Sequence, residues 1–131
     1  MGFDTPEDVR YTEEHEWVRD EGDGRARIGI TDFAQDQLTD VVYVDLPFPD
    51  ETFDQGDAMM VVESVKSVSD VYAPVDCTVL EINDELEASP ELVNEDPYGD
   101  GWMALVELAD PSQLDDLMDD EAYREFTQNE A

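Results

Sequence analysis

The stretch "VVESVKSVSDVYAPV", residues 61–75, contains Lys66, which is the only lysine among the 131 residues of the chain. Two apolar segments, residues 58–64 and 67–73, flank Lys66 with almost nothing between them, so the chain must reverse direction there. Because neither Gly nor Asn stands at the centre, we expect a turn without positive φ, most simply type I. The sequence therefore predicts an antiparallel hairpin with Lys66 on its tip.

A single lysine points to chemistry that requires a primary amine. The other five cationic side chains are all arginines. In an ordinary protein a loop lysine is usually a solvated surface residue, and that alternative stands here too. However, a neutral amine can be acylated, whereas a guanidinium group, with a pKa above about 12, stays protonated. Lys66 is therefore a candidate site of covalent modification.

Acidic residues dominate the charge of the chain. There are 37 Asp and Glu against 6 Lys and Arg, which gives a net charge of -31. The acids are interleaved with apolar runs, so we expect one folded domain under an anionic shell, which excludes nucleic acid and membrane surfaces as partners. At about 1 M salt the Debye length is only about 3 Å, so concentrated salt would relieve the repulsion between these carboxylates. An acidic surface with almost no lysine is typical of proteins from salt-accumulating microbes. Because concentrated salt screens charges beyond a few ångströms, contacts with partners there must be short-range.

Several residues that often carry chemistry are interpreted as structural. Cys77 is the only cysteine, heads the apolar run "CTVLEI" and fits packing in a reducing cytosol. His15, the only histidine, has no base, nucleophile or metal-ligand companion at a diagnostic spacing, and core packing is expected for Trp17 and Trp102. The N-terminus lacks the pattern of a signal peptide, so we expect a cytoplasmic protein. We expect no required metal and no catalytic residues.

The remaining sequence predicts short strands with helical additions. "EGDG" suits a tight connection in a hairpin over residues 16–30, and a short helix capped by Thr31 or Asp32 follows. Residues 84–101 are loop-like with a possible helical turn, whereas the tail from Asp110 is helical, with a second short helix from Asp119 or Asp120. Further strands are expected at residues 41–46, 77–83 and 102–108.

Several motifs resemble the glycine cleavage system H protein family of lipoyl carriers. "YTEEHEWV", "IGITDFAQDQLTDVVYVDLP", the stretch around Lys66, "ELVNEDPYGDGWM" and the helical tail occur in that family's order. The resemblance implies a mainly β fold, the barrel-sandwich hybrid of lipoyl and biotinyl carriers, with short helices. It also implies a single carrier domain over residues 1–131, with an N-terminal extension at 1–10 and a C-terminal helical segment at 110–127.

The same resemblance implies a function. Lys66 would carry lipoic acid through an amide bond, and Glu63 matches a position that lipoylating enzymes read. The carrier, itself not a catalyst, would pass an aminomethyl group from the pyridoxal-phosphate glycine decarboxylase (P protein) to the folate-dependent aminomethyltransferase (T protein). Dihydrolipoyl dehydrogenase (L protein) would reoxidise the arm. By the same resemblance Glu14, Glu16 and Asp70 lie near the docked amine, although surface charge alone explains three acids in so acidic a chain equally well.

The chain departs from the family pattern at two positions, and two other functions remain open. Cys77 stands where the family usually has glycine, so Asp76 or Cys77 must adopt that backbone geometry or the turn must differ locally. Glu14 replaces a small or variable residue. One alternative function is a lipoyl donor or relay in protein lipoylation. The other, a biotinyl carrier, is disfavoured because valine and serine rather than methionines flank Lys66.

Overall fold

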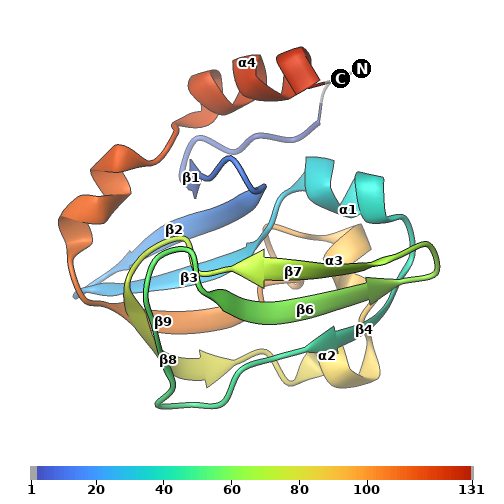
Figure 1. The fold of residues 1–131 in the computed structure, drawn as a ribbon, viewed down its shortest axis with the longest axis horizontal. Coiled ribbons are helices and arrows are strands. Elements are labelled where there is room, and N and C mark those ends of the chain that lie inside the picture. The colour runs from blue at the N-terminus through green and yellow to red at the C-terminus, as the bar shows by residue number, and fades with distance from the viewer. Residues whose placement is uncertain (1–2, 131) are drawn as a thin grey trace.

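The computed structural model describes residues 3–130, which form two antiparallel sheets with short helices around them (Figure 1). Residues 1 and 2, part of the expected N-terminal extension, and residue 131 lie outside the described residues. The six-stranded sheet has the order β1 (Arg10–Tyr11), β2 (Glu16–Gly22), β3 (Arg25–Ile30), β9 (Ala104–Leu108), β8 (Cys77–Ile82) and β5 (Thr52–Phe53). The three-stranded sheet has the order β4 (Val41–Asp45), β6 (Ala58–Ser64) and β7 (Val68–Tyr72).

The helices connect and cover the sheets. In chain order they are α1 (Asp32–Leu38), α2 (Glu85–Ala88), α3 (Leu92–Glu95), the 3₁₀ helix η1 (Pro111–Asp116) and α4 (Asp120–Glu130). In Figure 1, α4 lies across the top of the molecule near β1, and α1 lies above the turn that joins β6 to β7. This arrangement places α1 beside the hairpin that contains Lys66.

Two hydrophobic clusters hold these elements together. The larger one takes side chains from both sheets, among them Ile28 of β3, Val62 of β6 and Val79 of β8, all fully buried. Alternate residues of a strand point to one face, and in β3 the alternating Ala26, Ile28 and Ile30 all belong to this core. In the smaller cluster Tyr11 stacks on Tyr123, with ring centroids 4.3 Å apart and planes at 4°. This stack fixes α4 on β1.

Most predicted elements are confirmed. The predicted mainly β class with short helices and a C-terminal helix is correct, and β2 and β3 form the expected hairpin through Gly22, Asp23 and Gly24, which all have positive φ. Thr31 caps α1 by accepting a hydrogen bond from the N–H of Ala34. The strands predicted at 41–46, 58–64 and 77–83 end within one residue of the observed bounds.

Other details differ from the predictions. β9 begins at Ala104, two residues after the expected start, and Trp102 is only half-buried, with the guanidinium of Arg27 4.8 Å from its ring centroid. Core packing is confirmed for Trp17, which is fully buried. The tail begins as a 3₁₀ helix, capped by Asp110 as expected, and α4 runs to Glu130 rather than ending near residue 127.

Candidate functional site

A serine hydroxyl closes the hairpin turn that presents Lys66. The N–H of Ser64 donates to the carbonyl of Ser67 at 2.8 Å, and the Ser64 hydroxyl accepts from the N–H groups of Lys66 at 3.2 Å and Ser67 at 3.0 Å. None of the turn residues has a positive φ, as expected. The Lys66 side chain is exposed, and none of the hydrogen bonds or ion pairs among residues 3–130 involves its amine. The fold therefore presents this amine to solvent.

Glu63 lies on the outer face of the three-stranded sheet. It pairs in register with Tyr43 of β4 and with Val68 of β7, so these three side chains form one row across the strands. The neighbouring row contains Val62 and Ser69, which line a cavity on the opposite face. Glu63 is thus close to Lys66 in sequence but separate from that cavity.

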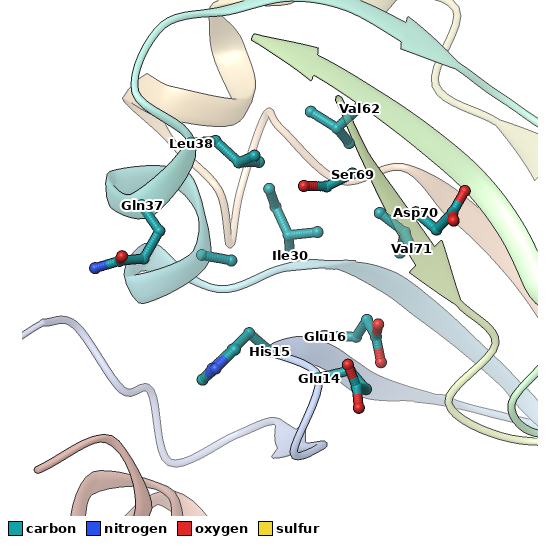
Figure 2. Close-up of a pocket in the computed structure, with 11 residues that line it drawn as sticks. Glu14, His15, Glu16, Ile30, Gln37, Leu38, Val62, Ser69, Asp70 and Val71 are labelled. Carbon is teal, nitrogen blue, oxygen red and sulfur yellow. The ribbon is translucent and has the colours of Figure 1, made fainter. Parts of the chain in front are cut away.

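A cavity of about 220 Å³ lies between β7, α1 and the segment that leads into β2 (Figure 2). The structure brings Glu14, Glu16 and Asp70 together in its wall, so the three acids named by the resemblance do share one site. Figure 2 shows Glu14 and Glu16 on one side, with Asp70 on the strand that faces them. The other lining residues are His15, Ile30, Ala34, Gln37, Leu38, Val62, Ser69 and Val71. The cavity therefore combines carboxylates with an apolar floor.

Glu16 is the buried acid of this cavity, with 3% of its surface exposed. Its Oε1 accepts a hydrogen bond from the Thr12 hydroxyl at 2.6 Å, and its Oε2 accepts one from the N–H of Tyr72 at 3.1 Å. Burial raises the pKa of Glu16 and the charge of Glu14 adds to the rise, whereas the hydrogen bonds from Thr12 and Tyr72 oppose it. Glu14 and Asp70 are exposed at the mouth.

His15 links the cavity wall to the C-terminal helix. Its Nδ1 lies 2.8 Å from the hydroxyl of Tyr123, which in turn lies 2.7 Å from the hydroxyl of Thr31, the cap of α1. The imidazole also stacks on Phe33 at 4.5 Å between centroids. The expected structural role of His15 is therefore confirmed.

The cavity lies within reach of a group attached to Lys66. Ser69 and Asp70 follow Lys66 by three and four residues, which corresponds to about 10 to 13 Å along an extended strand at about 3.3 Å per residue. Lysine and a lipoyl group together place about ten bonds between Cα and the dithiolane ring, each about 1.5 Å long, so the extended arm spans more than about 10 Å. An arm on Lys66 can therefore fold back onto the acids.

The turn that contains Cys77 differs from a glycine turn. Neither Asp76 nor Cys77 has a positive φ, so neither residue adopts the backbone geometry of a glycine, and the turn itself differs locally. Cys77 is the first residue of β8. Burial, with a contribution from the charge of Asp76, raises the pKa of the Cys77 thiol to about 11. Cys77 as a whole is 1% exposed and packs in the larger core cluster, as expected.

Two structural absences hold for residues 3–130. None of their helices is both long enough and apolar enough to cross a membrane. Among the same residues, no group of three or more His, Cys, Asp or Glu side chains is arranged to hold a metal ion.

Sequence reasoning missed three residues that shape the site. Ser64 closes the turn, Thr12 fixes the carboxylate of Glu16, and Tyr123 joins α4 to the cavity wall. The sequence could have indicated the role of Ser64, because it precedes a turn without glycine. Serine hydroxyls commonly accept hydrogen bonds from backbone N–H groups two or three residues later in the chain. The contact of Tyr123 with His15 spans 108 residues, so no local pattern indicates it.

Comparisons with known proteins agree with this geometry. A family model described as "Glycine cleavage H-protein" matches residues 9–130. The "Probable glycine cleavage system H protein" of Haloarcula marismortui is 57% identical over 125 residues, covering 95% of this chain and 98% of the relative. The "Glycine cleavage system H protein" of Marinobacter nauticus is 57% identical over 120 residues, covering 92% of each chain.

A solved structure supports the same assignment. The crystal structure of a glycine cleavage system H protein from Mycobacterium marinum matches with a TM-score of 0.84 at 35% identity, covering 96% of this chain and 99% of that one. The likeness confirms the fold class that the sequence motifs implied. The chain therefore belongs to the glycine cleavage H-protein family, whose members are the non-catalytic lipoyl carriers that shuttle an aminomethyl group within the glycine cleavage system.

Proposed function

We propose that Lys66 is the residue that carries lipoic acid, through an amide bond to its side-chain nitrogen. The supporting observation is the position of the chain's single lysine, exposed on the tip of the β6–β7 hairpin. An amine in this position can enter the active site of another protein. The bound lipoyl group supplies a disulfide that accepts electrons and the aminomethyl group, chemistry that the twenty side chains lack.

The cavity beside the hairpin is the resting place of the loaded arm. Glu16, Asp70 and Glu14 receive the protonated amine of the cargo through charge-assisted hydrogen bonds. The apolar side chains of Ile30, Leu38, Val62 and Val71 contact the aliphatic part of the arm and exclude water from it. Because Glu16 is held by Thr12 and Tyr72, its carboxylate needs little rearrangement when the cargo arrives.

The partners follow from membership of the glycine cleavage system. The arm visits three enzymes in turn: the pyridoxal-phosphate decarboxylase, the folate-dependent aminomethyltransferase and dihydrolipoyl dehydrogenase. A lipoylating enzyme first modifies Lys66 and reads Glu63. Tethering keeps the cargo at a high local concentration near each partner. Residues 1–131 act as one carrier domain, and the exchange takes place in the cytoplasm.

Intact mass spectrometry tests the attachment. Protein produced with a lipoylating enzyme and lipoic acid should gain the mass of one lipoyl amide. Lys66→Arg keeps the positive charge but removes the acylatable amine, so it should gain nothing. Glu81→Gln, which changes an exposed acid of β8, serves as a control that should be modified like the wild type. A lipoyl increment that persists in Lys66→Arg would remove Lys66 from its proposed role.

A further inference from the structure

Half of the chain's six basic residues lie on one face of the β2–β3 hairpin. Arg19 and Arg27 are directly opposite each other in the register, and Arg25 precedes Arg27 by two residues in β3. Alternate residues of a strand point to one face, so the three arginines share a face, whereas Ile28 points into the larger core cluster. Like charges directly opposite each other destabilise a sheet. This face therefore favours the approach of a negative charge.

Arg27 differs from the other four arginines in its contacts. Within the described part of the chain, each of the others forms a side-chain hydrogen bond or an ion pair, whereas the side chain of Arg27 forms neither. Its Nε is buried and has no hydrogen-bond partner there. A buried donor without a partner destabilises the fold. In a chain with 37 acids, a guanidinium without a carboxylate indicates that its anion comes from another molecule.

Trp102 holds the Arg27 side chain in position. The guanidinium carbon of Arg27 lies 4.8 Å from the centroid of the Trp102 ring, which is a cation–π contact. The carbonyl of Trp102 accepts a hydrogen bond from Nδ2 of the buried Asn83 at 2.7 Å. The neighbour of Arg27 on β9 is Leu105, which is also buried. The two half-buried side chains thus form a preformed cation beside an aromatic ring, and together with Arg19 and Arg25 we name them the arginine face.

The arginine face has the chemistry of a carboxylate site. A guanidinium presents five N–H donors in a planar fork that matches the two oxygens of a carboxylate. Small molecules bind in concave sites, but Arg27 lines neither the cavity in Figure 2 nor a cavity of about 250 Å³ that Phe48 and Met59 line. A protein segment instead brings a carboxylate together with apolar atoms that cover the Trp102 ring. Arginine and tryptophan are enriched among the side chains that dominate binding between proteins.

We propose that the arginine face is the docking surface for an acidic segment of one of the three partner enzymes, with a partner carboxylate bound to Arg27. This docking rests on the proposed partners and adds a contact that is separate from the arm on Lys66. The segment that fits carries an Asp or Glu next to an apolar side chain. Its carboxylate accepts hydrogen bonds from the guanidinium of Arg27, and its apolar side chain covers Trp102.

The arginine face and Lys66 belong to different sheets. Ile28, the neighbour of Arg27, points into a core cluster that also contains Val62 of the three-stranded sheet. The side chain of Arg27 therefore points away from the sheet that carries Lys66. An enzyme held at the arginine face leaves the arm free to move between the active site and the cavity. Such a second contact raises the local concentration of the arm at that enzyme.

Concentrated salt suits a contact of this kind. A net charge of -31 repels an acidic partner in dilute solution. At about 1 M salt, charges more than about 3 Å apart are largely screened, so neither repulsion nor attraction acts at long range. Ion pairs at contact distance and contacts between apolar groups remain, and the arginine face supplies both.

Isothermal titration calorimetry of the lipoylated carrier with each purified partner enzyme in molar potassium chloride tests the docking. Arg27→Gln removes the charge and the planar fork, so it should raise the Kd for one of the enzymes roughly tenfold. Arg124→Gln removes the same charge from α4, where Arg124 pairs with Asp120, and should leave every Kd within about twofold. Equal Kd values of the wild type and Arg27→Gln for all three enzymes would overturn the docking.

Glu107 distinguishes a partner's carboxylate from one within the chain. It is exposed on β9 directly opposite Arg25 and is therefore diagonal to Arg27. Glu107→Gln removes a charge that repels an incoming carboxylate, so the Kd should fall or stay within about twofold. If Glu107→Gln instead raises the Kd as much as Arg27→Gln does, Arg27 acts through Glu107 and the carboxylate site is rejected.

The Nε–H signal of Arg27 and the indole N–H signal of Trp102 report on the site in nitrogen-15 spectra. The enzyme that binds should shift or broaden both signals, in the wild type and in Lys66→Arg alike, because the contact does not involve the arm. Millimolar potassium glutamate, added in molar potassium chloride, should leave both signals unchanged. Saturation by free glutamate would assign the site to a small carboxylate and overturn the protein occupant.

The outcomes separate this docking from the proposed attachment at Lys66. Arg27→Gln should be lipoylated like the wild type, since it leaves the hairpin tip unchanged. A wild-type protein that is not lipoylated on Lys66 overturns the proposed attachment, whereas unchanged Kd values overturn only the arginine face. If Arg27→Gln melts below the wild type, Arg27→Lys replaces it. That variant keeps the charge but loses the planar fork, so the Kd should rise roughly threefold, and an unchanged Kd would again reject the arginine face.

Discussion

The N–H of Tyr72 donates a hydrogen bond to Oε2 of Glu16 at 3.1 Å, and this bond crosses from one sheet to the other. Tyr72 is the last residue of β7 in the three-stranded sheet, whereas Glu16 is the first residue of β2 in the six-stranded sheet. The second carboxylate oxygen of Glu16 is occupied by the hydroxyl of Thr12. A buried acid therefore both joins the sheets and forms the wall of the cavity.

Removing a charge from the cavity should shorten the life of the loaded arm. Glu16→Gln and Asp70→Asn keep the shape of the side chain but lose a charge-assisted hydrogen bond, typically worth about 1.5–3 kcal/mol. Each variant, loaded from glycine by the decarboxylase, should release ammonia and formaldehyde without folate roughly tenfold faster than the wild type.

Glu81→Gln provides the control for this experiment, because it removes the same charge from the exposed side of β8. It should release its cargo at the wild-type rate, and all of the variants should still be lipoylated. Equal release from the wild type, Glu16→Gln and Asp70→Asn would mean that these acids do not hold the amine, and docking in the cavity would have to be abandoned.

The pH dependence of stability should reveal the buried carboxyl of Glu16. Its pKa is raised in the folded protein, chiefly by burial, so the folded state keeps this proton to a higher pH than the unfolded chain does. The contribution of Glu16 to the free energy of unfolding is therefore full below the unfolded pKa and is lost as pH rises through the folded pKa.

Urea unfolding of the wild type and Glu16→Gln at constant salt measures this contribution. As pH rises from the ordinary pKa of a glutamate, about 4.3, through the raised pKa of the folded protein, the difference in the free energy of unfolding should move in favour of the glutamine variant and then level off. The comparison cancels the other acids, which are the same in both proteins. A difference that does not change with pH would show that Glu16 titrates as an ordinary exposed carboxyl.

The positions of the longer strands were predictable because each is a short apolar run bounded by turn residues. β6 is a continuous apolar run from Ala58 to Val62, and β8 is the mainly apolar run CTVLEI, and both runs are visible in the sequence. β1 and β5 have only two residues each, too few for any period, and they are strands because β2 and β8 pair with them. Pairing partners far along the chain cannot be inferred from two residues.

The candidate attachment residue was easier to single out from the sequence than the cavity. Lys66 stands out because no other lysine is present, whereas Glu14, Glu16 and Asp70 are chemically identical to 34 other acids, and only the fold brings them together. The burial of Glu16 and its hydrogen bond from Tyr72 depend on how the two sheets pack together, which local sequence does not reveal. The resemblance to a known family pointed to those three acids, and the structure shows that they line one cavity.

The stability of the chain should depend on salt. Six basic residues cannot pair with 37 acids, so most carboxylates repel one another across the surface. Raising potassium chloride from dilute to molar concentration should raise the melting temperature, measured by circular dichroism, because screening weakens this repulsion. Sucrose at equal osmolality should raise it less. A melting temperature that stays constant with potassium chloride would contradict adaptation to high salt but not the carrier function.

The hydroxyl of Tyr123 should stabilise both α4 and the cavity wall. Tyr123→Phe keeps the stacked ring on Tyr11 but removes the hydrogen bonds to His15 and Thr31, all within buried or half-buried surroundings. We expect a loss of about 1–3 kcal/mol in the free energy of unfolding, measured by urea denaturation. Lipoylation should be unchanged, since the hairpin tip is untouched.

Tyr43→Phe is a matched control for Tyr123→Phe, because it removes a phenolic hydroxyl from an exposed side chain. It should cost less than about 0.5 kcal/mol. If the two variants are equally stable, the contacts of the Tyr123 hydroxyl contribute nothing net to the folded state.

The proposed attachment residue and two of the acids proposed to receive the cargo belong to different parts of the molecule. Lys66 stands on a turn, while Glu14 and Glu16 belong to the body and Asp70 lies several residues down the strand. With the proposed roles, substitution of Glu14 or Glu16 should change the dwell time of the cargo, and substitution of Lys66 should change whether the carrier is charged. In a carrier with this layout, the lifetime of the bound cargo can change without a change in the residue that is modified.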